Sequence, residues 1–272
     1  MLPKTGGHGY VCNYTLRQIE DRQQALKDSK NADIQERPDI TTKILLAHEE
    51  NPSKMTKIDL ITVCQSNFVA GSDTTAITLS SIFYHLLKYS TRYRNAERDR
   101  CRFKDIESSH VQEAQNELPY LQAVIKKALR IHSATGLPMQ RVVPPEWTTI
   151  AGQFIPGGAS VNINAWVAHR NQSVFGNDAK EWRPERWLEF EEQGRGREVE
   201  RYMLAFGMGS RTCIGKNISL LEISKAVPQL VRNFDFVLEE ECSDDLKCLN
   251  RWFVKQLNFR GRVMARQARM PG

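Results

Sequence analysis

The stretch FGMGSRTCIG, residues 206–215, constrains the chain more than any other segment. It places one cysteine, Cys213, among three glycines, with Arg211 two residues before it and an aliphatic run after it. Glycines allow a backbone to approach a flat object closely. We expect a helix to begin at Ile214, and its positive end would favour the thiolate form of Cys213. The segment therefore predicts a tight loop that presents one sulfur atom at a helix N-terminus.

Four roles are open to this sulfur: an inert buried thiol, half of a disulfide, a nucleophile or a thiolate metal ligand. No CxxC pair is present, and the cysteines are sparse, which is typical of a reducing compartment. No His/Asn signature accompanies Cys213 as the partner of a nucleophile. A single thiolate as the only protein ligand suits haem better than zinc, which takes four ligands. Arg211 would supply a cation for an anionic cofactor group. The six cysteines are Cys12, Cys64, Cys101, Cys213, Cys242 and Cys248.

Composition places the chain among soluble globular proteins, because 40% of its 272 residues are hydrophobic and 26% are charged. The net charge is +6, but no Lys/Arg block is interleaved with aromatic residues, which argues against nucleic acid as a partner. The first residues contain no apolar segment of the signal-peptide type. The most apolar stretch, residues 58–87, carries Asp59 and Asp73. It therefore predicts a long buried helix rather than a membrane span.

Helical patterns dominate the chain, with a smaller β-rich part. Asp39 is expected to cap a helix that ends at Asn51-Pro52, and Thr56 with Asp59 forms a capping box that opens the next helix. A hairpin is expected around residues 156–158, and strands from residue 251 onward. We predict a mainly α fold with a small β-sheet (α+β), in which residues 1–272 form a single domain. The predicted helices are 14–30, 40–50, 57–88, 116–133 and 214–233.

The loop at residues 206–215 resembles the haem-binding signature of the cytochrome P-450 family. Phe206, Gly209, Arg211, Cys213 and Gly215 occupy the five fixed positions of that signature. The resemblance implies that Cys213 is the proximal ligand of a haem iron and that Phe206 shields its sulfur. It further implies that Arg211 meets a haem propionate, and that the two glycines allow close packing on the porphyrin.

A second segment, AGSDTT at residues 70–75, is similar to the distal-helix motif of the same family. By itself it is more simply explained as a polar helix face, although Asp73 would be costly to bury. The resemblance implies that Gly71 opens space above the haem. It also implies that Asp73 and Thr74 relay protons to bound oxygen.

A third segment, EWRPERW at residues 181–187, resembles the family's Pro-Glu-Arg-Phe motif, with Trp187 in place of the phenylalanine. Arg141 matches a position that often holds the second haem propionate. Without the resemblance, Arg183 and Arg186 would be interpreted as solvated charges beside glutamates.

One position departs from the family pattern. The family pairs a helix Glu-x-x-Arg with the arginine of the third motif, but here Lys127 stands in place of the glutamate before Arg130. Lys127, Arg130 and Arg186 are then expected to converge, unless Lys127 is deprotonated or turns to solvent. Removing one partner from a buried ion pair costs about 3–5 kcal/mol. Glu181 or Glu185 could substitute as the carboxylate. We expect the chain to hold haem poorly, and Lys127→Glu to raise haem occupancy and thermal stability.

The resemblance covers nearly the whole chain, but it corresponds only to the carboxy-terminal half or so of a family member. It implies a truncated cytochrome P-450 fold. We expect exposed apolar surface where the other half of such a fold would pack.

The resemblance implies a haem-thiolate monooxygenase, an oxidoreductase that inserts one oxygen atom from O2 into a C–H bond of a small organic substrate. Similarity to filamentous-fungal members of the pisatin-demethylase and benzoate-hydroxylase kind suggests an aromatic or phenolic substrate. Electrons would come from NADPH through a flavoprotein reductase. The implied location is the cytosolic face of the endoplasmic reticulum, although no anchor is evident in the sequence and a cytosolic location stays open. Two alternatives remain: a catalytically incompetent remnant, and a haem-free helical module that binds a protein through its basic face.

Overall fold

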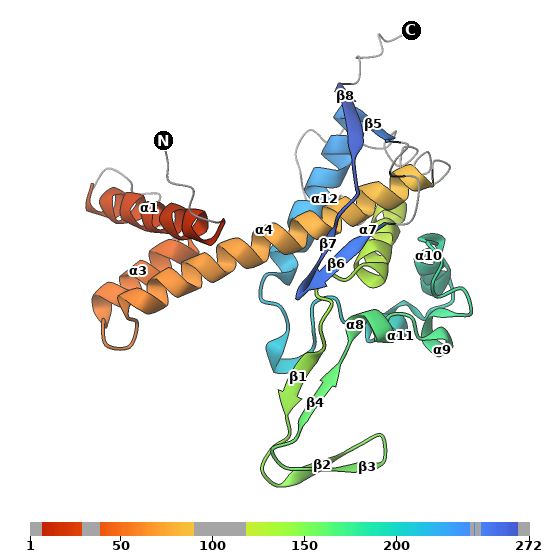
Figure 1. Ribbon diagram of the computed structural model, residues 1–272, viewed down its shortest axis with the longest axis horizontal. Coiled ribbons are helices and arrows are strands. Elements are labelled where there is room, and N and C mark those ends of the chain that lie inside the picture. The colour runs from red at the N-terminus through yellow and green to blue at the C-terminus, as the bar shows by residue number, and fades with distance from the viewer. Residues whose placement is uncertain (1–6, 29–38, 90–117, 240–241, 243–245, 266–272) are drawn as a thin grey trace. The chain divides into compact units, whose positions relative to one another are not determined.

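Helices make up most of the computed structural model, which describes residues 7–28, 39–89, 118–239, 242 and 246–265 (Figure 1). The strands of the described part pair into two-stranded antiparallel sheets. The prediction of a mainly α fold with a small β part is therefore confirmed. The long helices are α1 (Gly7–Lys27), α3 (Ile40–Glu50), α4 (Lys57–Lys88), α7 (Pro119–Ile131) and α12 (Lys216–Asn233).

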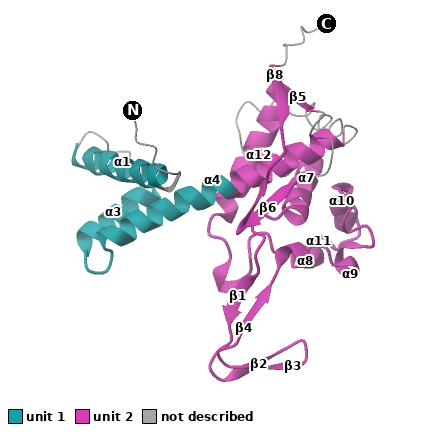
Figure 2. Ribbon diagram, viewed as in Figure 1, with its two compact units in different colours: residues 1–73 teal, residues 74–272 magenta. Residues whose placement is uncertain are grey.

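The chain divides into two compact units, Met1–Asp73 and Thr74–Gly272 (Figure 2). Helix α4 belongs to both, because the boundary falls inside it. The expectation of a single domain stays a prediction.

The first unit is built from α1, α3 and the first half of α4, which enclose Ile19, Leu45 and Leu60. Helix α3 begins after Asp39, whose side chain accepts a hydrogen bond from the Thr42 N–H at 2.8 Å, as predicted. The helix predicted over residues 14–30 instead begins at Gly7 and ends at Lys27.

The predicted capping box opens α4. The Thr56 N–H donates to Asp59 Oδ2 at 2.9 Å, and the Asp59 N–H donates to Thr56 Oγ1 at 3.2 Å. The helix then runs from Lys57 to Lys88, the bounds that the sequence predicts.

Burial along α4 differs from the prediction of a helix that is buried throughout. Residues 77–86 are largely buried, but residues 66–72 are exposed, including Phe68 and Val69. The apolar content of the segment predicts a core helix along its whole length. Only its second half packs against other helices of the second unit.

The core of the second unit lies among the second half of α4, α7 and α12. Its members include Ile82, Leu86, Val124, Ile125 and Val227. Helix α7 begins at Pro119, where a proline fits because the first helical N–H needs no partner. Its apolar residues at helical spacing, Leu121, Val124, Ile125, Ala128 and Leu129, are buried, as expected.

The predicted hairpin around residues 156–158 is wrong in its strand pairing. Strand β2 (Trp147–Ile150) pairs with β3 (Gln153–Pro156), whereas β1 (Met139–Val142) pairs with β4 (Ser160–Ile163). The hairpin turn is Ala151-Gly152, with φ of +50° and +79°. Both positive values are typical of a type I′ turn. The Pro-Gly-Gly segment instead leads from one sheet to the other.

The terminal strands are confirmed. Strand β6 (Cys248–Arg251) pairs with β7 (Phe253–Gln256), with Trp252 at the tip of this hairpin. Strand β8 (Gly261–Ala265) pairs with β5 (Phe234–Leu238). The short helices between β4 and α12 are α8 (Ala165–Ala168), α9 (Gln172–Phe175), α10 (Glu185–Glu192), α11 (Gly196–Glu200) and the 3-10 turn η2 (Gly209–Arg211). None of the helices in the described ranges combines the length and apolar character needed to cross a bilayer.

Candidate functional site

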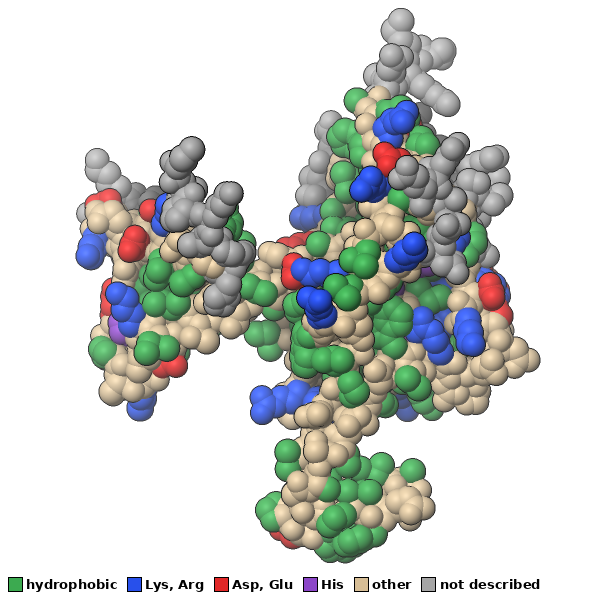
Figure 3. All heavy atoms as spheres, viewed as in Figure 1, with side chains coloured by type: hydrophobic (Ala, Val, Ile, Leu, Met, Phe, Trp, Pro, Cys, Tyr) green, Lys and Arg blue, Asp and Glu red, His purple; other side chains and the backbone are tan. Residues whose placement is uncertain are grey.

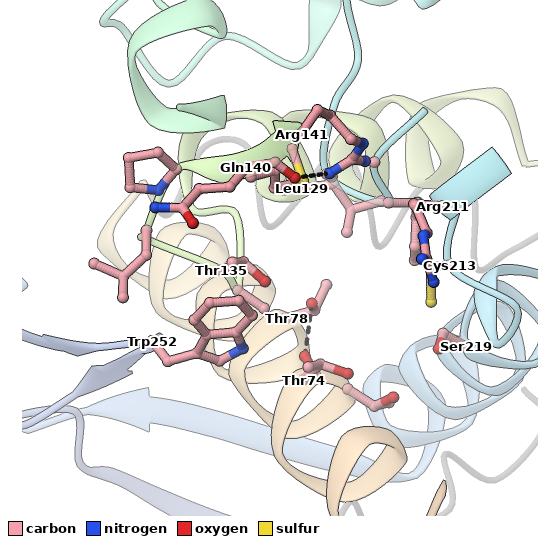
Figure 4. Close-up of a pocket in the computed structure, with 18 of the residues that line it drawn as sticks. Thr74, Thr78, Leu129, Thr135, Gln140, Arg141, Arg211, Cys213, Ser219 and Trp252 are labelled. Carbon is pink, nitrogen blue, oxygen red and sulfur yellow. Dashed lines mark hydrogen bonds between the residues drawn. The ribbon is translucent and has the colours of Figure 1, made fainter. Parts of the chain in front are cut away.

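A cavity of about 1130 Å³ lies in the second unit and contains the sulfur of Cys213 in its wall (Figure 4). Its volume exceeds the roughly 300–1,000 Å³ of typical small-molecule sites. Three threonines of α4 contribute to the lining, together with parts of segments 134–142 and 205–213. The start of α12 and Trp252 complete it.

The loop that carries Cys213 is closed by its own backbone. The Cys213 N–H donates to the Phe206 carbonyl at 2.8 Å, and Gly207 and Gly209 have φ of +69° and +71°. These values favour glycine, because a side chain is strained in this region. A Cβ at Gly209 would meet no atom within 4 Å, so this side of the loop is open space. The loop therefore leaves room against its backbone for a bulky flat group.

Helix α12 begins at Lys216, two residues later than predicted, with Gly215 as its N-cap. The Lys216 N–H donates to the Cys213 carbonyl at 3.3 Å. A Cβ at Gly215 would lie 3.8 Å from the Cys213 sulfur, an ordinary contact. The thiol thus sits immediately before the helix N-terminus.

Helix α4 presents Thr74, Thr75 and Thr78 to the cavity. The Thr78 hydroxyl donates to the Thr74 carbonyl at 2.9 Å, a bond within the helix that is drawn in Figure 4. Asp73 precedes Thr74 in α4 but belongs to the first unit. Its predicted role in proton delivery stays a prediction.

Two arginines from distant parts of the chain line the same cavity. Arg141 comes from β1 and Arg211 from the cysteine loop. Arg141 donates from Nη1 to the Gln140 carbonyl at 2.7 Å, and neither guanidinium forms an ion pair with a described carboxylate. Their positive charge is therefore available to an anionic group in the cavity.

The chemistry of this cavity fits haem. The described residues contain no cluster of three or more His, Cys, Asp or Glu side chains that could hold a metal by itself. Cys213 therefore suits an iron whose remaining ligands come from a macrocycle. Arg141 and Arg211 suit the two propionates, and Leu129, Ala205 and Ile223 add apolar lining.

The cavity brings together five residues that the sequence singled out: Thr74, Arg141, Phe206, Arg211 and Cys213. Gly209 and Gly215 flank the lining residues without being among them. Trp252 and Ser219 also line the cavity, and the sequence analysis missed both. Trp252 reaches the cavity from the β6–β7 tip with φ of +74°, which no local sequence signal indicates for a tryptophan.

The predicted convergence of three cations outside this cavity is confirmed. Lys127 and Arg130 of α7 and Arg186 of α10 are all buried, with exposed fractions of 0–2%. Glu185 of α10 accepts from the Tyr120 hydroxyl of α7 at 3.0 Å, and a compensating role for Glu181 or Glu185 stays a prediction.

Asp178 supplies a carboxylate to Arg186, but it forms no hydrogen bond with Lys127 or Arg130. It accepts from Arg186 Nη1 at 2.6 Å and from Arg183 Nε at 2.7 Å. The hydrogen bond from Arg186 first, and the charges of both arginines, lower the pKa of Asp178 to about 2 despite some burial. The sequence offered no signal for it, since Asp178 lies outside all three motifs.

Lys127 stays inside the protein rather than turning to solvent. Its amine forms no hydrogen bond with the residues that the structure describes. Burial, followed by the charges of Arg130 and Arg186, lowers the pKa of Lys127 to about 6. The neutral amine is therefore its main form at pH 7.

His169 connects this cluster to the cysteine loop. Its Nδ1 lies 2.9 Å from the Arg130 carbonyl, and its Nε2 accepts from the Leu204 N–H at 2.7 Å. Since Nε2 accepts, the proton is on Nδ1, which donates to Arg130. Burial lowers the pKa of His169 to about 4, so the ring is neutral. One imidazole thereby ties the end of α7 to the segment that leads to Phe206.

Comparison with known proteins agrees with this geometry. The family model described as Cytochrome P450 matches residues 8–258. The chain is 39% identical over 269 residues to the cytochrome P450 monooxygenase cicH of Emericella nidulans, covering 98% of this chain and 53% of that protein. It is 47% identical over 191 residues to a pisatin demethylase of Fusarium vanettenii, covering 70% of this chain and 36% of that protein. The chain spans about half the length of the relatives it matches.

Proposed function

The chain belongs to the cytochrome P450 family, and on this premise we propose that it forms the haem-binding part of a haem-thiolate monooxygenase. The observation that carries the proposal is the position of the Cys213 sulfur in the wall of a cavity that Arg141 and Arg211 also line. When bound there, haem supplies the activation of O2 and the transfer of one oxygen atom to a C–H bond.

Each residue of the loop has a defined task in this proposal. Cys213 ligates the iron as a thiolate, which the start of α12 stabilises. Phe206 covers the sulfur, and its carbonyl holds the Cys213 N–H. Arg211 and Arg141 bind the propionates through their guanidinium groups. Gly209 and Gly215 keep side chains out of the space that the macrocycle needs.

The distal residues handle protons. With haem in the cavity, the Thr74 hydroxyl would donate a hydrogen bond to the O2 substrate, and Asp73 would supply the proton that Thr74 passes on.

The substrate is a small organic molecule, and an aromatic or phenolic compound is the favoured class. Support comes from the name of two relatives, pisatin demethylases of Fusarium vanettenii, and from the apolar side chains of Leu137, Val142 and Trp252 along the cavity. Trp252 offers an aromatic face for such a compound to stack on.

The electron donor in this proposal is an NADPH-dependent flavoprotein reductase at the cytosolic face of the endoplasmic reticulum. The net charge of +6 is compatible with an acidic partner, and electrostatic complementarity would speed its docking.

The proposal is tested by expressing the chain with a haem supply and recording the spectrum of its reduced carbon monoxide complex. We expect a red-shifted Soret band of the thiolate type in the wild type. Cys213→Ala should abolish it, whereas Cys248→Ala should keep it, because Cys248 is equally exposed but lies outside the cavity lining.

Two outcomes would contradict the proposal. A red-shifted band that persists in Cys213→Ala would remove Cys213 as the ligand. A wild type that folds normally without taking up haem would favour the binding-module alternative, and aggregation in its place would favour a catalytically incompetent remnant.

A further inference from the structure

The cation cluster behind the candidate site contains buried hydrogen-bond donors that have no acceptor. These are Lys127 Nζ, Arg130 Nε and Arg186 Nε. Their three side chains come from α7 and α10 and are at most 2% exposed. A buried N–H without a partner loses its hydration and gains nothing in return, and charge increases this cost.

The acceptors near the cluster are already occupied. Arg130 donates from Nη2 to the Ala179 carbonyl at 2.6 Å and from Nη1 to the His169 carbonyl. Arg186 uses its two terminal nitrogens on Phe175 and Asp178. The Asp178 carboxylate also accepts a hydrogen bond from Arg183 Nε. None of these contacts reaches the three orphaned nitrogens.

Helix α10 brings one further carboxylate to α7, that of Glu185, whose Oε1 accepts from the Tyr120 hydroxyl at 3.0 Å and not from an orphaned nitrogen. Helix α4 contributes His85, which stacks on Trp182 at 4.2 Å and whose pKa burial lowers to about 3. Its ring is therefore neutral. The charged groups that act on Lys127 are Arg130, Arg183, Arg186 and Asp178. The carboxylate in this set, Asp178, binds Arg183 and Arg186 through other nitrogens, so the three orphaned nitrogens have no acceptor in it.

We propose that Lys127, Arg130 and Arg186 form an internal binding site for a small monovalent anion such as chloride. The anion accepts from the orphaned N–H groups and enters together with a proton on Lys127. The bound anion supplies the negative charge that a carboxylate at residue 127 would otherwise supply. The site is separate from the proposed monooxygenase function, because it involves neither Cys213 nor the cavity.

Proton and anion uptake are coupled at this site. A neutral Lys127 leaves the cluster less positive and binds an anion weakly, whereas a protonated Lys127 attracts it strongly. Anion binding therefore stabilises the folded protein on the acidic side of neutrality and fades as the pH rises.

The test compares the melting temperature of the full chain in sodium chloride and in sodium gluconate at equal ionic strength and equal haem content. Gluconate is too bulky for a buried site. At about pH 6 we expect a Tm about 2–4 °C higher in chloride, since about 1 kcal/mol shifts Tm by this amount in a protein of this size. At about pH 9 we expect the two salts to give the same Tm, because Lys127 is then neutral.

Three variants make the result specific. Lys127→Met removes the amine at similar length and should abolish the chloride effect. Lys127→Glu supplies an internal carboxylate and should raise Tm in both salts alike. The matched control is Lys126→Met, because Lys126 pairs with Glu200 at 2.5 Å on the partly exposed side of α7 and is not one of the three donors. This variant should keep the chloride effect.

Equal melting temperatures in the two salts at about pH 6 would overturn the proposal, since a water molecule in the site would not respond to the salt. A chloride effect that survives in Lys127→Glu would also overturn it, and this variant decides the question even where Lys127→Met fails to fold. Neither result bears on haem binding, which the carbon monoxide spectrum tests separately.

Discussion

Lys127 stands where the family motif has a glutamate, and its charge state follows from its position. An ammonium group without a hydrogen-bond partner, next to Arg130 and Arg186, would be strongly unfavourable. Deprotonation removes most of that cost, because a neutral amine is easier to bury. Arg130 keeps its charge at neutral pH, although burial lowers its pKa to about 9.

This charge state predicts a pH-dependent stability. The pKa of Lys127 is about 6 in the folded chain and 10.5 in the unfolded chain, so unfolding takes up a proton between these values. The free energy of unfolding should therefore rise with pH in this window, by about 1.4 kcal/mol per pH unit from this group. Urea denaturation in gluconate buffer between about pH 7 and pH 8.5 measures it.

Lys127→Glu is the comparison that isolates the effect. The variant should lose this slope and gain roughly 3–5 kcal/mol at neutral pH, which is the cost of an incomplete buried pair. Buried histidines do not contribute to the slope of stability against pH in this window. His85, His132 and His169 have lowered pKa values and are neutral above pH 7. An identical slope in wild type and variant would contradict a neutral Lys127.

His169→Ala should weaken the link between α7 and the cysteine loop. The substitution leaves the Arg130 carbonyl and the Leu204 N–H buried without their partner. Each such group costs about 1–3 kcal/mol, so we expect a loss of roughly 2–6 kcal/mol and a lower haem content. Thermal denaturation and the haem-to-protein absorbance ratio measure both effects. Gln172→Ala, at a nearby exposed position, is the control and should change the free energy of unfolding by less than about 0.5 kcal/mol. An equal loss in both variants would contradict the role of His169 as the link between α7 and the cysteine loop.

At the scale of elements, α4 carries an exposed middle section that works against its own stability. Gly71 lies in the interior of a 32-residue helix, and a Cβ there would meet no atom within 4 Å. A glycine in a helix interior costs about 0.8–1.0 kcal/mol relative to alanine. Packing against other atoms does not explain the glycine. We propose that it keeps a side chain out of the space above a bound haem.

Gly71→Ala should stabilise the chain by up to about 1 kcal/mol, because it improves helix propensity without a clash. Urea denaturation monitored by circular dichroism measures this gain. In the haem-loaded protein, the same methyl group should weaken carbon monoxide binding if Gly71 opens space above the iron. Ala76→Gly, at an exposed position of the same helix, should destabilise by a similar amount. A lower free energy of unfolding for Gly71→Ala would contradict this expectation, because it would mean that the added methyl group clashes with another group.

At the scale of the whole molecule, large apolar side chains remain on the surface. Ile214 is 90% exposed beside Cys213, and hydrophobic side chains gather on the β2–β3 hairpin, where Trp147 and Phe154 pair at 5.5 Å (Figure 3). Contiguous apolar surface marks sites of association. The chain spans about half the length of the relatives it matches.

We therefore expect the chain by itself to self-associate at micromolar concentrations. Sedimentation velocity over a concentration series measures the effect. The double substitution Trp147→Thr with Phe154→Thr should shift association to several-fold higher concentration, because it removes the aromatic pair while keeping residues that suit strands. A wild type that stays monomeric throughout the series would contradict this expectation.

Local signals explain what could be predicted from the sequence. The cap at Asp39, the box at Thr56 and the periodicity of α7 act over three or four residues, and each gave the right element. The cysteine motif works in the same way, since Gly207 and Gly209 allow the turn that brings Cys213 back to the Phe206 carbonyl. Pro156-Gly157-Gly158 is also a local signal, but it indicated a turn without indicating which strands would pair.

The long helices, the thiol-bearing loop and the family could be predicted, because each depends on residues close together in the chain. The pairing of β4 with β1, the contact of Asp178 with Arg186, and the burial of Lys127 without a hydrogen-bond acceptor came from contacts between distant segments. The physical reason is that pairing, burial and desolvation depend on which distant segments meet. The charge that Lys127 carries is set by those neighbours and not by its place in the chain.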